Sequence, residues 1–255
     1  MTGYRDLVVK ELLEAWRTRR LILLAVLFAC VGVAAPLITK LTPDLIQLFG
    51  ATPFITDLPT PGVADVVSEL LTLTIQFGAI AAILLAMGSI ATERRRGTAA
   101  LVLARPVTRS AFLWAKLVAL GVELAIALGL AVLAAYVYTS VLFHRPSALA
   151  WIELGAVIWL SAMVYGSITL LGSVLSRSAL GAAGFGLLAL IVVAVLSVIP
   201  NLGPWLPAGL SSVGLSFALR EQSPDVDPII SILVSVAIAA ISVGIAWLRF
   251  RRIDL

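Results

Sequence analysis

Six long apolar stretches divide the chain, and its polar residues are gathered in the segments between them. Each stretch is near or above the roughly 18 residues that a helix needs to cross the hydrocarbon core of a bilayer. Because lipid offers no partners to backbone N–H and C=O groups, stretches of this length are expected to be helical. The pattern predicts an all-α integral membrane protein with six transmembrane helices. They are expected at about residues 21–38, 70–91, 117–143, 151–175, 179–199 and 229–248.

The composition indicates the same class of protein. Of the 255 residues, 61% are hydrophobic and 13% are charged, whereas a soluble domain has about 45–50% and about 25%. The net charge of +4 is small, and the basic residues lie in short flanks between apolar stretches. A surface that follows nucleic-acid phosphates is therefore not expected. We expect a single transmembrane domain, residues 1–255, in a lipid bilayer.

Lysine and arginine are distributed unequally across the predicted membrane. With the N-terminus in the cytoplasm, all but three of the 18 Lys and Arg residues fall on that side, the exceptions being Lys40, Arg145 and Arg220. Because cytoplasmic segments of membrane proteins are enriched in Lys and Arg, both termini are expected in the cytoplasm. The opposite side receives residues 200–228, which are proline-rich and still fairly apolar. We expect them to form an outer loop or short re-entrant helices.

Residues 1–20 predict an amphipathic helix ahead of the first span. Val8 and Trp16 fall on its apolar face, and Lys10 and Glu11 fall on its polar face. A helix of this kind lies flat at the membrane interface. Two roles are open for it: a simple anchor that orients the first span, or a lever that transmits motion along the membrane surface.

The cytoplasmic segment 93–110, between the second and third spans, predicts a short helix. Thr98 can cap this helix, and Pro106 ends it, because the residue before a proline disfavours helical backbone. Leu101 and Leu103 are then apolar side chains in an aqueous segment. They pack either on the chain's own bundle or in a groove on a cytoplasmic partner.

This segment resembles the signature loop of ABC-2 type transporter permeases, the membrane subunits of type-2 ABC exporters. The residues that carry the resemblance are Glu93, Arg94, Gly97, Thr98, Leu101, Leu103, Pro106, Val107, Arg109 and Lys116. It extends over the whole chain, from the Lys10-Glu11-Leu12 segment to residues 250–255. The resemblance implies an interfacial helix and a short coupling helix that both contact a separate ATPase. It assigns ATPase coupling to Glu93, Arg94, Gly97, Thr98, Leu101, Leu103, Pro106 and Arg109, with Lys10, Glu11 and Trp16 on the interfacial helix.

The chain has no ATP-binding loop of its own. A loop that holds the phosphates of ATP needs a Gly-Lys-Ser/Thr triplet, and none of the lysines Lys10, Lys40 and Lys116 follows a glycine. We therefore expect a non-catalytic subunit without a cofactor, with ATP and Mg²⁺ bound by the partner. The resemblance implies two copies of a cytoplasmic ABC ATPase and a second permease copy or homologue. The expected location is the plasma membrane of a prokaryote.

Glu123 is the clearest ionisable residue inside a predicted span. A carboxyl group in the membrane must pair or take up a proton. Glu123 therefore either pairs with an arginine near the cytoplasmic face, or contacts a substrate or forms a proton-coupled site. Gln76 and Tyr165 are further candidates for lining a substrate path. No metal site is expected, because the lone His144 has no second ligand close in sequence.

These features favour the permease subunit of an ATP-driven exporter, which forms the substrate path. An ion-coupled secondary transporter is an alternative, although it usually has internal repeats and several coupling sites at mid-membrane. An intramembrane enzyme would need paired carboxylates or an activated nucleophile, which the spans do not contain. A passive membrane scaffold stays open as a further alternative.

Overall fold

The computed structural model describes residues 2–48, 60–98, 108–200, 202–220 and 227–252. These residues are helical almost throughout, and none of them forms a strand. The helices are α1 (Thr2–Arg17), α2 (Arg20–Leu48), α3 (Val63–Met87), α4 (Ala91–Arg95), α6 (Arg109–Leu142), α7 (Ala148–Leu175), α8 (Ala179–Ser197), η1 (Gly203–Trp205), η2 (Pro207–Gly209), α9 (Leu210–Leu219) and α10 (Pro228–Arg251).

Within these residues, six segments are long and apolar enough to cross a membrane. They are Arg20–Asp44, Val63–Arg95, Arg109–Leu142, Ala148–Leu175, Ala179–Ser197 and Pro228–Arg251. The prediction of an all-α integral membrane protein with six spans is therefore confirmed.

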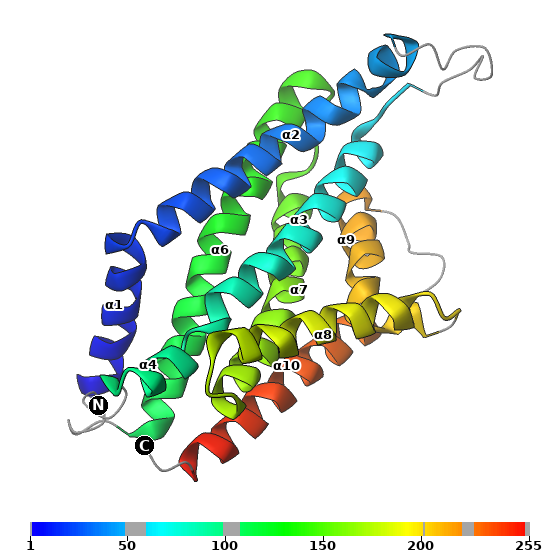
Figure 1. Ribbon diagram of the computed structural model, residues 1–255. Helices are drawn as coiled ribbons and strands as arrows, with labels where there is room; N and C mark the ends of the chain where they lie inside the picture. Colours follow the sequence, from blue (N-terminus) through cyan, green and yellow to red (C-terminus); the bar gives the residue numbers. More distant parts are fainter. Residues whose placement is uncertain (1, 49–59, 99–107, 201, 221–226, 253–255) are drawn as a thin grey trace.

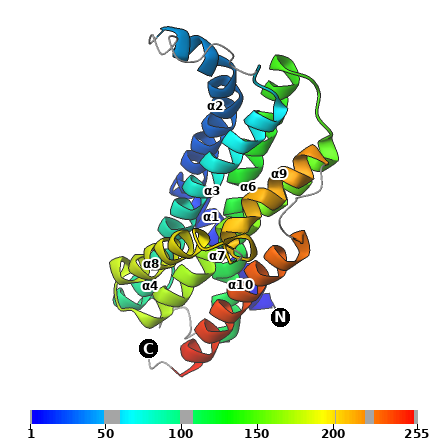
Figure 2. The ribbon, with the colours of Figure 1, turned by 90° about the vertical axis from the view of Figure 1, so that its right-hand side faces the viewer.

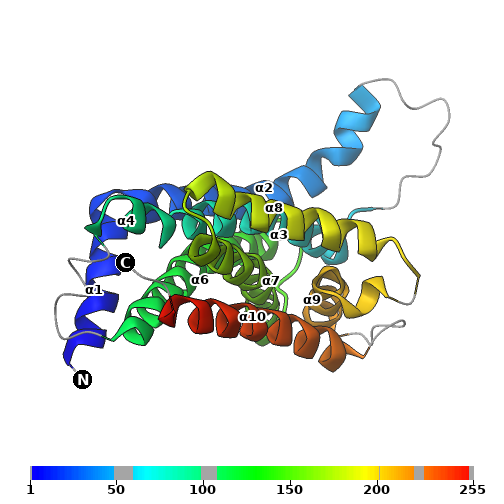
Figure 3. The same ribbon diagram turned by 60° about the horizontal axis from the view of Figure 1, so that its bottom comes forward.

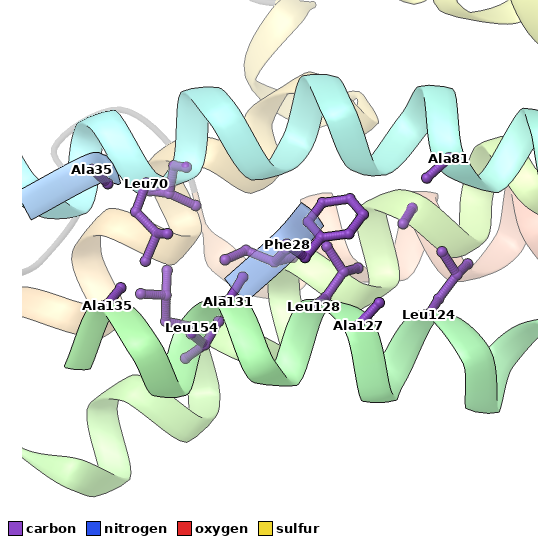
Figure 4. Close-up of a cluster of buried hydrophobic side chains, with 14 of the residues drawn as sticks. Phe28, Ala35, Leu70, Ala81, Leu124, Ala127, Leu128, Ala131, Ala135 and Leu154 are labelled. Atoms are coloured by element: carbon purple, nitrogen blue, oxygen red, sulfur yellow. The ribbon is translucent and has the colours of Figure 1, made fainter. Parts of the chain in front are cut away.

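Helices α3, α6 and α7 form the centre of the bundle (Figure 1). Helix α2 packs along α6, and α7 lies between α8 and α10 (Figure 3). The largest apolar cluster joins α2, α3, α6 and α7 and includes Phe28, Leu70, Leu128 and Leu154 (Figure 4). At the crossing of α2 and α6, a side chain at Gly32 would collide with the carbonyl of Ala131. Small residues permit such close backbone contact between membrane helices.

Three helices extend well beyond the apolar stretches that predict them, and one of them is α6, which begins at Arg109 instead of near residue 117. Helix α2 continues to Leu48 through Pro36 and Pro43, although its polar residues Lys40 and Asp44 suggest an earlier end. Helix α3 begins already at Val63, where the Gly62 N–H donates to the Asp65 carboxylate at 2.8 Å. Proline is tolerated in transmembrane helices because neighbouring groups satisfy the freed backbone, so hydropathy alone underestimates the helix length here.

The amphipathic helix is shorter than the expected residues 1–20. Helix α1 ends at Arg17, and Arg19 takes a left-handed backbone conformation with a φ of 57°. This conformation is uncommon for residues other than glycine and marks a sharp change of direction. As a result, Arg20 is the first residue of α2 and not the last of the amphipathic helix.

The described part of the segment 200–228 contains the short helices η1, η2 and α9. Leu210 and Val213 of this segment are fully buried and cluster with Val157 of α7. A side chain at Gly214 would press on Leu71 of α3. Helix α9 thus packs against α3 and α7 as part of the bundle (Figure 2).

Candidate coupling site

Helices α1 and α4 and the start of α6 lie at one end of the bundle, which we call the α1 end (Figure 1). Charged side chains from these three helices contact one another there. Lys116 of α6 is central, and its side chain is only 4% exposed. Its Nζ donates to Glu11 of α1 at 3.0 Å and to Glu93 of α4 at 2.6 Å. It also lies over the Phe112 ring, 5.1 Å from the ring centroid. One buried ammonium therefore joins three helices that are far apart in the sequence.

Lys10 adds a second, half-exposed ammonium to the same group. Its Nζ lies 2.9 Å from Glu11, 3.4 Å from Glu14 and 3.7 Å from Glu93. We call these five residues, Lys10, Glu11, Glu14, Glu93 and Lys116, the charged cluster. Positive and negative groups alternate in it, which compensates the desolvation of its buried members.

The pKa values at α1 reflect this alternation. Burial alone would raise the pKa of Glu11, but the charge of Lys116 and the hydrogen bond and charge of Lys10 outweigh it, and the pKa falls below its usual value. Burial alone would lower the pKa of Lys10. The hydrogen bond and charge of Glu11, with the charges of Glu93 and Glu14, instead raise that pKa. Both groups of α1 are therefore held in their charged forms.

Glu123 lies one step deeper in the bundle and pairs with Arg20 at the start of α2. The Arg20 Nη2 donates to the Glu123 Oε1 at 2.6 Å. The residue Glu123 is 2% exposed, whereas the Arg20 side chain is 44% exposed. The second oxygens of Glu123 and Glu93 are both buried and have no hydrogen-bond partner among the described residues. The Arg20–Glu123 pair is thus a second ion pair that joins the α1–α2 segment to α6, beside the Glu11–Lys116 pair.

A cavity of about 640 Å³ lies between these groups. Charged residues line it from α1, α2, α4 and α6, and apolar residues line it from α3 and α7. We call it the charged cavity. Helices from widely separated parts of the sequence thus border one space at the α1 end.

The junction between α3 and α4 is fixed to α7. The hydroxyl of Ser173 accepts from the Ile90 and Ala91 N–H groups at 3.1 and 2.9 Å, and it donates to the Met87 carbonyl at 3.1 Å. Arg94 donates to the Val174 carbonyl of α7 at 2.8 Å. A displacement of α4 would therefore also act on α3 and α7.

The predicted coupling residues separate into two groups. Glu93 and Arg94 lie on the helix α4 and not in a loop. Gly97 follows this helix with a φ of 71°. The Thr98 hydroxyl donates to the Glu93 carbonyl at 3.2 Å. Leu101, Leu103 and Pro106 lie outside the described residues. The predicted short helix that contains them is therefore not described.

The other end of that segment is tied to α10. Thr108 caps α6 by accepting from the Ala111 N–H at 3.1 Å. Arg109 donates to the Arg251 carbonyl at 2.9 Å. The Phe112 and Phe250 rings stack with centroids 5.7 Å apart. The segment 93–110 thus begins in α4 and ends at the start of α6, which is bound to α10.

The remaining candidates do not join the charged cluster. Trp16 is 59% exposed on α1. Gln76 and Tyr165 line a different cavity, between α3, α7, α8 and α9. Sequence reasoning gave Glu14 and Arg20 no role at this site. Two features of the sequence could have identified these two residues. One is the line of charged residues along the amphipathic helix, and the other is the carboxylate in a later span, which needs a cation as its partner.

The fold and the charged end define a multi-pass helical membrane protein whose amphipathic N-terminal helix is bound to its third span. Residues 6–209 match the family described as ABC-2 family transporter protein. The chain belongs to this family. It is 31% identical, over 97% of each chain, to an uncharacterized transmembrane protein, YxlG, of Bacillus subtilis (strain 168). Members of the family are membrane components that associate with ABC ATPases and are not themselves catalytic.

Proposed function

We propose that the chain is the permease subunit of an ATP-driven exporter and that the charged cluster passes movement from a cytoplasmic ATPase to the spans. Two ATPase copies and a second permease copy or homologue would complete the assembly, with ATP and Mg²⁺ bound by the ATPases. The observation that carries the proposal is the link that Lys116 makes between α1, α4 and α6. An anchor for the first span would not need this link.

The α1 end is proposed to face the cytoplasm, which places both termini there. Arg20, Arg94 and Arg109 flank spans at this end, and the enrichment of cytoplasmic segments in Lys and Arg supports this orientation. The relative from a bacterium is in keeping with a prokaryotic plasma membrane.

The route of coupling follows from the connections of α4. Residues 99–107 join α4 to the start of α6, and both of these carry members of the charged cluster. A push on this segment would shift Glu93 and Lys116 together, and α1 would follow through Glu11. The same shift would reach α3 and α7 through Ser173 and Arg94. The amphipathic helix would then act as a lever.

Replacing Lys116 by methionine tests the proposal. The complex with the ATPase is placed in nanodiscs, and alkylation of Val198→Cys, at the far end of α8, is followed with and without ATP and vanadate in a Cys30→Ala background. We expect nucleotide to change alkylation in the parent protein and no longer in Lys116→Met. Lys40→Met is the matched control, because Lys40 is exposed and distant from the cluster.

A double variant tests whether residues 99–107 dock on the ATPase. Replacing Leu101 and Leu103 together by glutamate should abolish co-purification of the ATPase, because charged side chains would not enter an apolar groove. If no ATPase associates with the unaltered chain, and flux instead follows an ion gradient, the chain is a secondary transporter and the proposal is wrong.

A further inference from the structure

A second cavity, of about 790 Å³, lies between α3, α7, α8 and α9. Its volume is in the range of cavities that hold drug-sized molecules, about 300–1,000 Å³. Every described residue that lines it is uncharged, so we call it the uncharged cavity. It extends from the middle of the spans, where Gln76 and Tyr165 lie, to Ser197 at the C-terminal end of α8.

Two polar side chains near the middle of the spans line this cavity without a hydrogen-bond partner among the described residues. Tyr165 is 6% exposed, lines the cavity, and has no hydrogen-bond partner for its hydroxyl among the described residues. Gln76 also lines the cavity; it is exposed on the surface of its span, and its amide is likewise unpaired within the described part of the chain. An unpaired amide or hydroxyl in a membrane span is costly. Two of them in one cavity therefore point to a ligand that completes their hydrogen bonds.

Most other hydroxyls of the lining can only accept, whereas that of Ser68 is exposed and has no partner among the described residues. The hydroxyl of Thr72 donates to the Ser68 carbonyl, and those of Ser211 and Ser212 donate to carbonyls within their own segment. Their oxygens keep free lone pairs toward the cavity. With Gln76 and Tyr165, the lining offers both donors and acceptors but no compensating charge.

We propose that the uncharged cavity binds the transported molecule, and that this molecule is an amphiphile with an uncharged hydroxyl or amide head. This proposal rests on the proposed transport function for its role, but the binding itself does not require the ATPase. A free ion or a charged head would lose its hydration in the cavity without gaining a counter-charge. The apolar residues of α8 and α9 that share the lining would receive the hydrocarbon part.

Photolabelling of the full chain in nanodiscs tests the proposal. The probes are diazirine derivatives of hexadecanol, of palmitate and of hexadecyltrimethylammonium, with the diazirine near the head in each. Labelled peptides are quantified by mass spectrometry. Peptides from the lipid-exposed face of α8, around Leu188, report how much of each probe is in the bilayer.

We expect the alcohol to label residues 68–80 and 208–215, and the charged probes to label them at least about tenfold less, because an uncompensated charge is costly there. Gln76→Leu and Tyr165→Phe should each lower labelling by the alcohol about fivefold, the effect of one lost hydrogen bond. Tyr138→Phe is the matched control, because Tyr138 is exposed on α6 and does not line the cavity.

Equal labelling by the three probes, or labelling unchanged by both variants, would overturn the proposal. A disulfide between Thr72→Cys residues of two chains, together with absent labelling, would assign the cavity to a second copy instead. ATPase co-purification is measured in parallel. Labelling without an associated ATPase would contradict the transport function alone, and an associated ATPase without labelling would contradict the cavity alone.

Discussion

The charged cavity and the uncharged cavity are built on opposite principles. At the α1 end, ammonium and carboxylate groups from three helices contact one another, and Lys116 is almost completely enclosed by its partners. In the uncharged cavity, Gln76 and Tyr165 face an open space without a partner within the described residues. A network satisfied mainly from within fixes the relative positions of helices. Unpaired polar groups around a space can instead form hydrogen bonds to a ligand. We therefore assign the charged cavity to the transmission of movement and the uncharged cavity to ligand binding.

The largest effect is expected for Lys116→Met, which removes the centre of the charged cluster. Glu11 and Glu93 would then lie close together without this ammonium. Breaking a buried ion pair in this way costs about 3–5 kcal/mol. Thermal unfolding in nanodiscs should show the loss, while Lys40→Met should stay within about 0.5 kcal/mol. Photolabelling of the uncharged cavity should be unchanged in Lys116→Met. If this labelling fell as well, the two cavities would not have separate roles.

A smaller and asymmetric effect is expected for the Arg20–Glu123 pair. Arg20→Met leaves a carboxylate buried without a cation and should cost about 2 kcal/mol. Glu123→Gln leaves a half-exposed guanidinium that water can solvate and should cost about 1 kcal/mol. The double variant should be more stable than Arg20→Met alone. If Glu123→Gln is the more harmful of the two single changes in thermal unfolding, Glu123 has a role beyond this pair.

Gly186→Ala should affect the uncharged cavity rather than the charged cluster. A side chain at Gly186 of α8 would collide with the Thr169 hydroxyl of α7 and lie 2.7 Å from Ile83 of α3. Overpacking of this kind costs about 1–3 kcal/mol, and the shifted α8 should change labelling by the hexadecanol probe. Gly184→Ala, on the same helix, has no atom within 4 Å of the added carbon. It should be neutral or stabilising by up to about 1 kcal/mol, and equal effects of the two changes would disprove the close contact.

The smallest effect is expected from pH. The lowered pKa of Glu11 means that its contribution is complete above the ordinary value of 4.5 and is lost as the pH falls further, through the lowered pKa. The raised pKa of Lys10 means that its contribution is complete below the ordinary value of 10.5. A spin label at Leu13→Cys should therefore report an unchanged α1 between about pH 6 and 9. Mobilisation of α1 within that window would contradict the assignment of its charges.

The six spans could be predicted because each is a continuous apolar stretch in one part of the chain. Glu123 could be identified for the same reason, since a carboxylate stands out in such a stretch. An arginine could be offered as its partner, but which arginine could not be predicted, because Arg20 is 103 positions away in the sequence. The break at Arg19, which assigns Arg20 to α2, follows from a single backbone conformation.

The charged cluster was also only partly predictable. Lys10 and Glu11 were assigned to the polar face of an amphipathic helix, but that pattern indicates an aqueous face as readily as a partner helix. Lys116 begins an apolar stretch, where a positive flank is ordinary. Its burial depends on α1 folding back onto α6. The meeting of Gln76 and Tyr165 in one cavity likewise depends on how α3 and α7 pack.

The most direct test of the coupling role is a distance measurement across the charged cluster. Spin labels are placed at Leu13→Cys on α1 and Trp114→Cys on α6, both exposed positions, in a Cys30→Ala chain bound to its ATPase. If the cluster moves as one body, the distance distribution is narrow and the same with and without trapped ATP, and Lys116→Met broadens it. A distribution that stays equally narrow in Lys116→Met, or that shifts on ATP binding while the cluster is intact, would contradict the account.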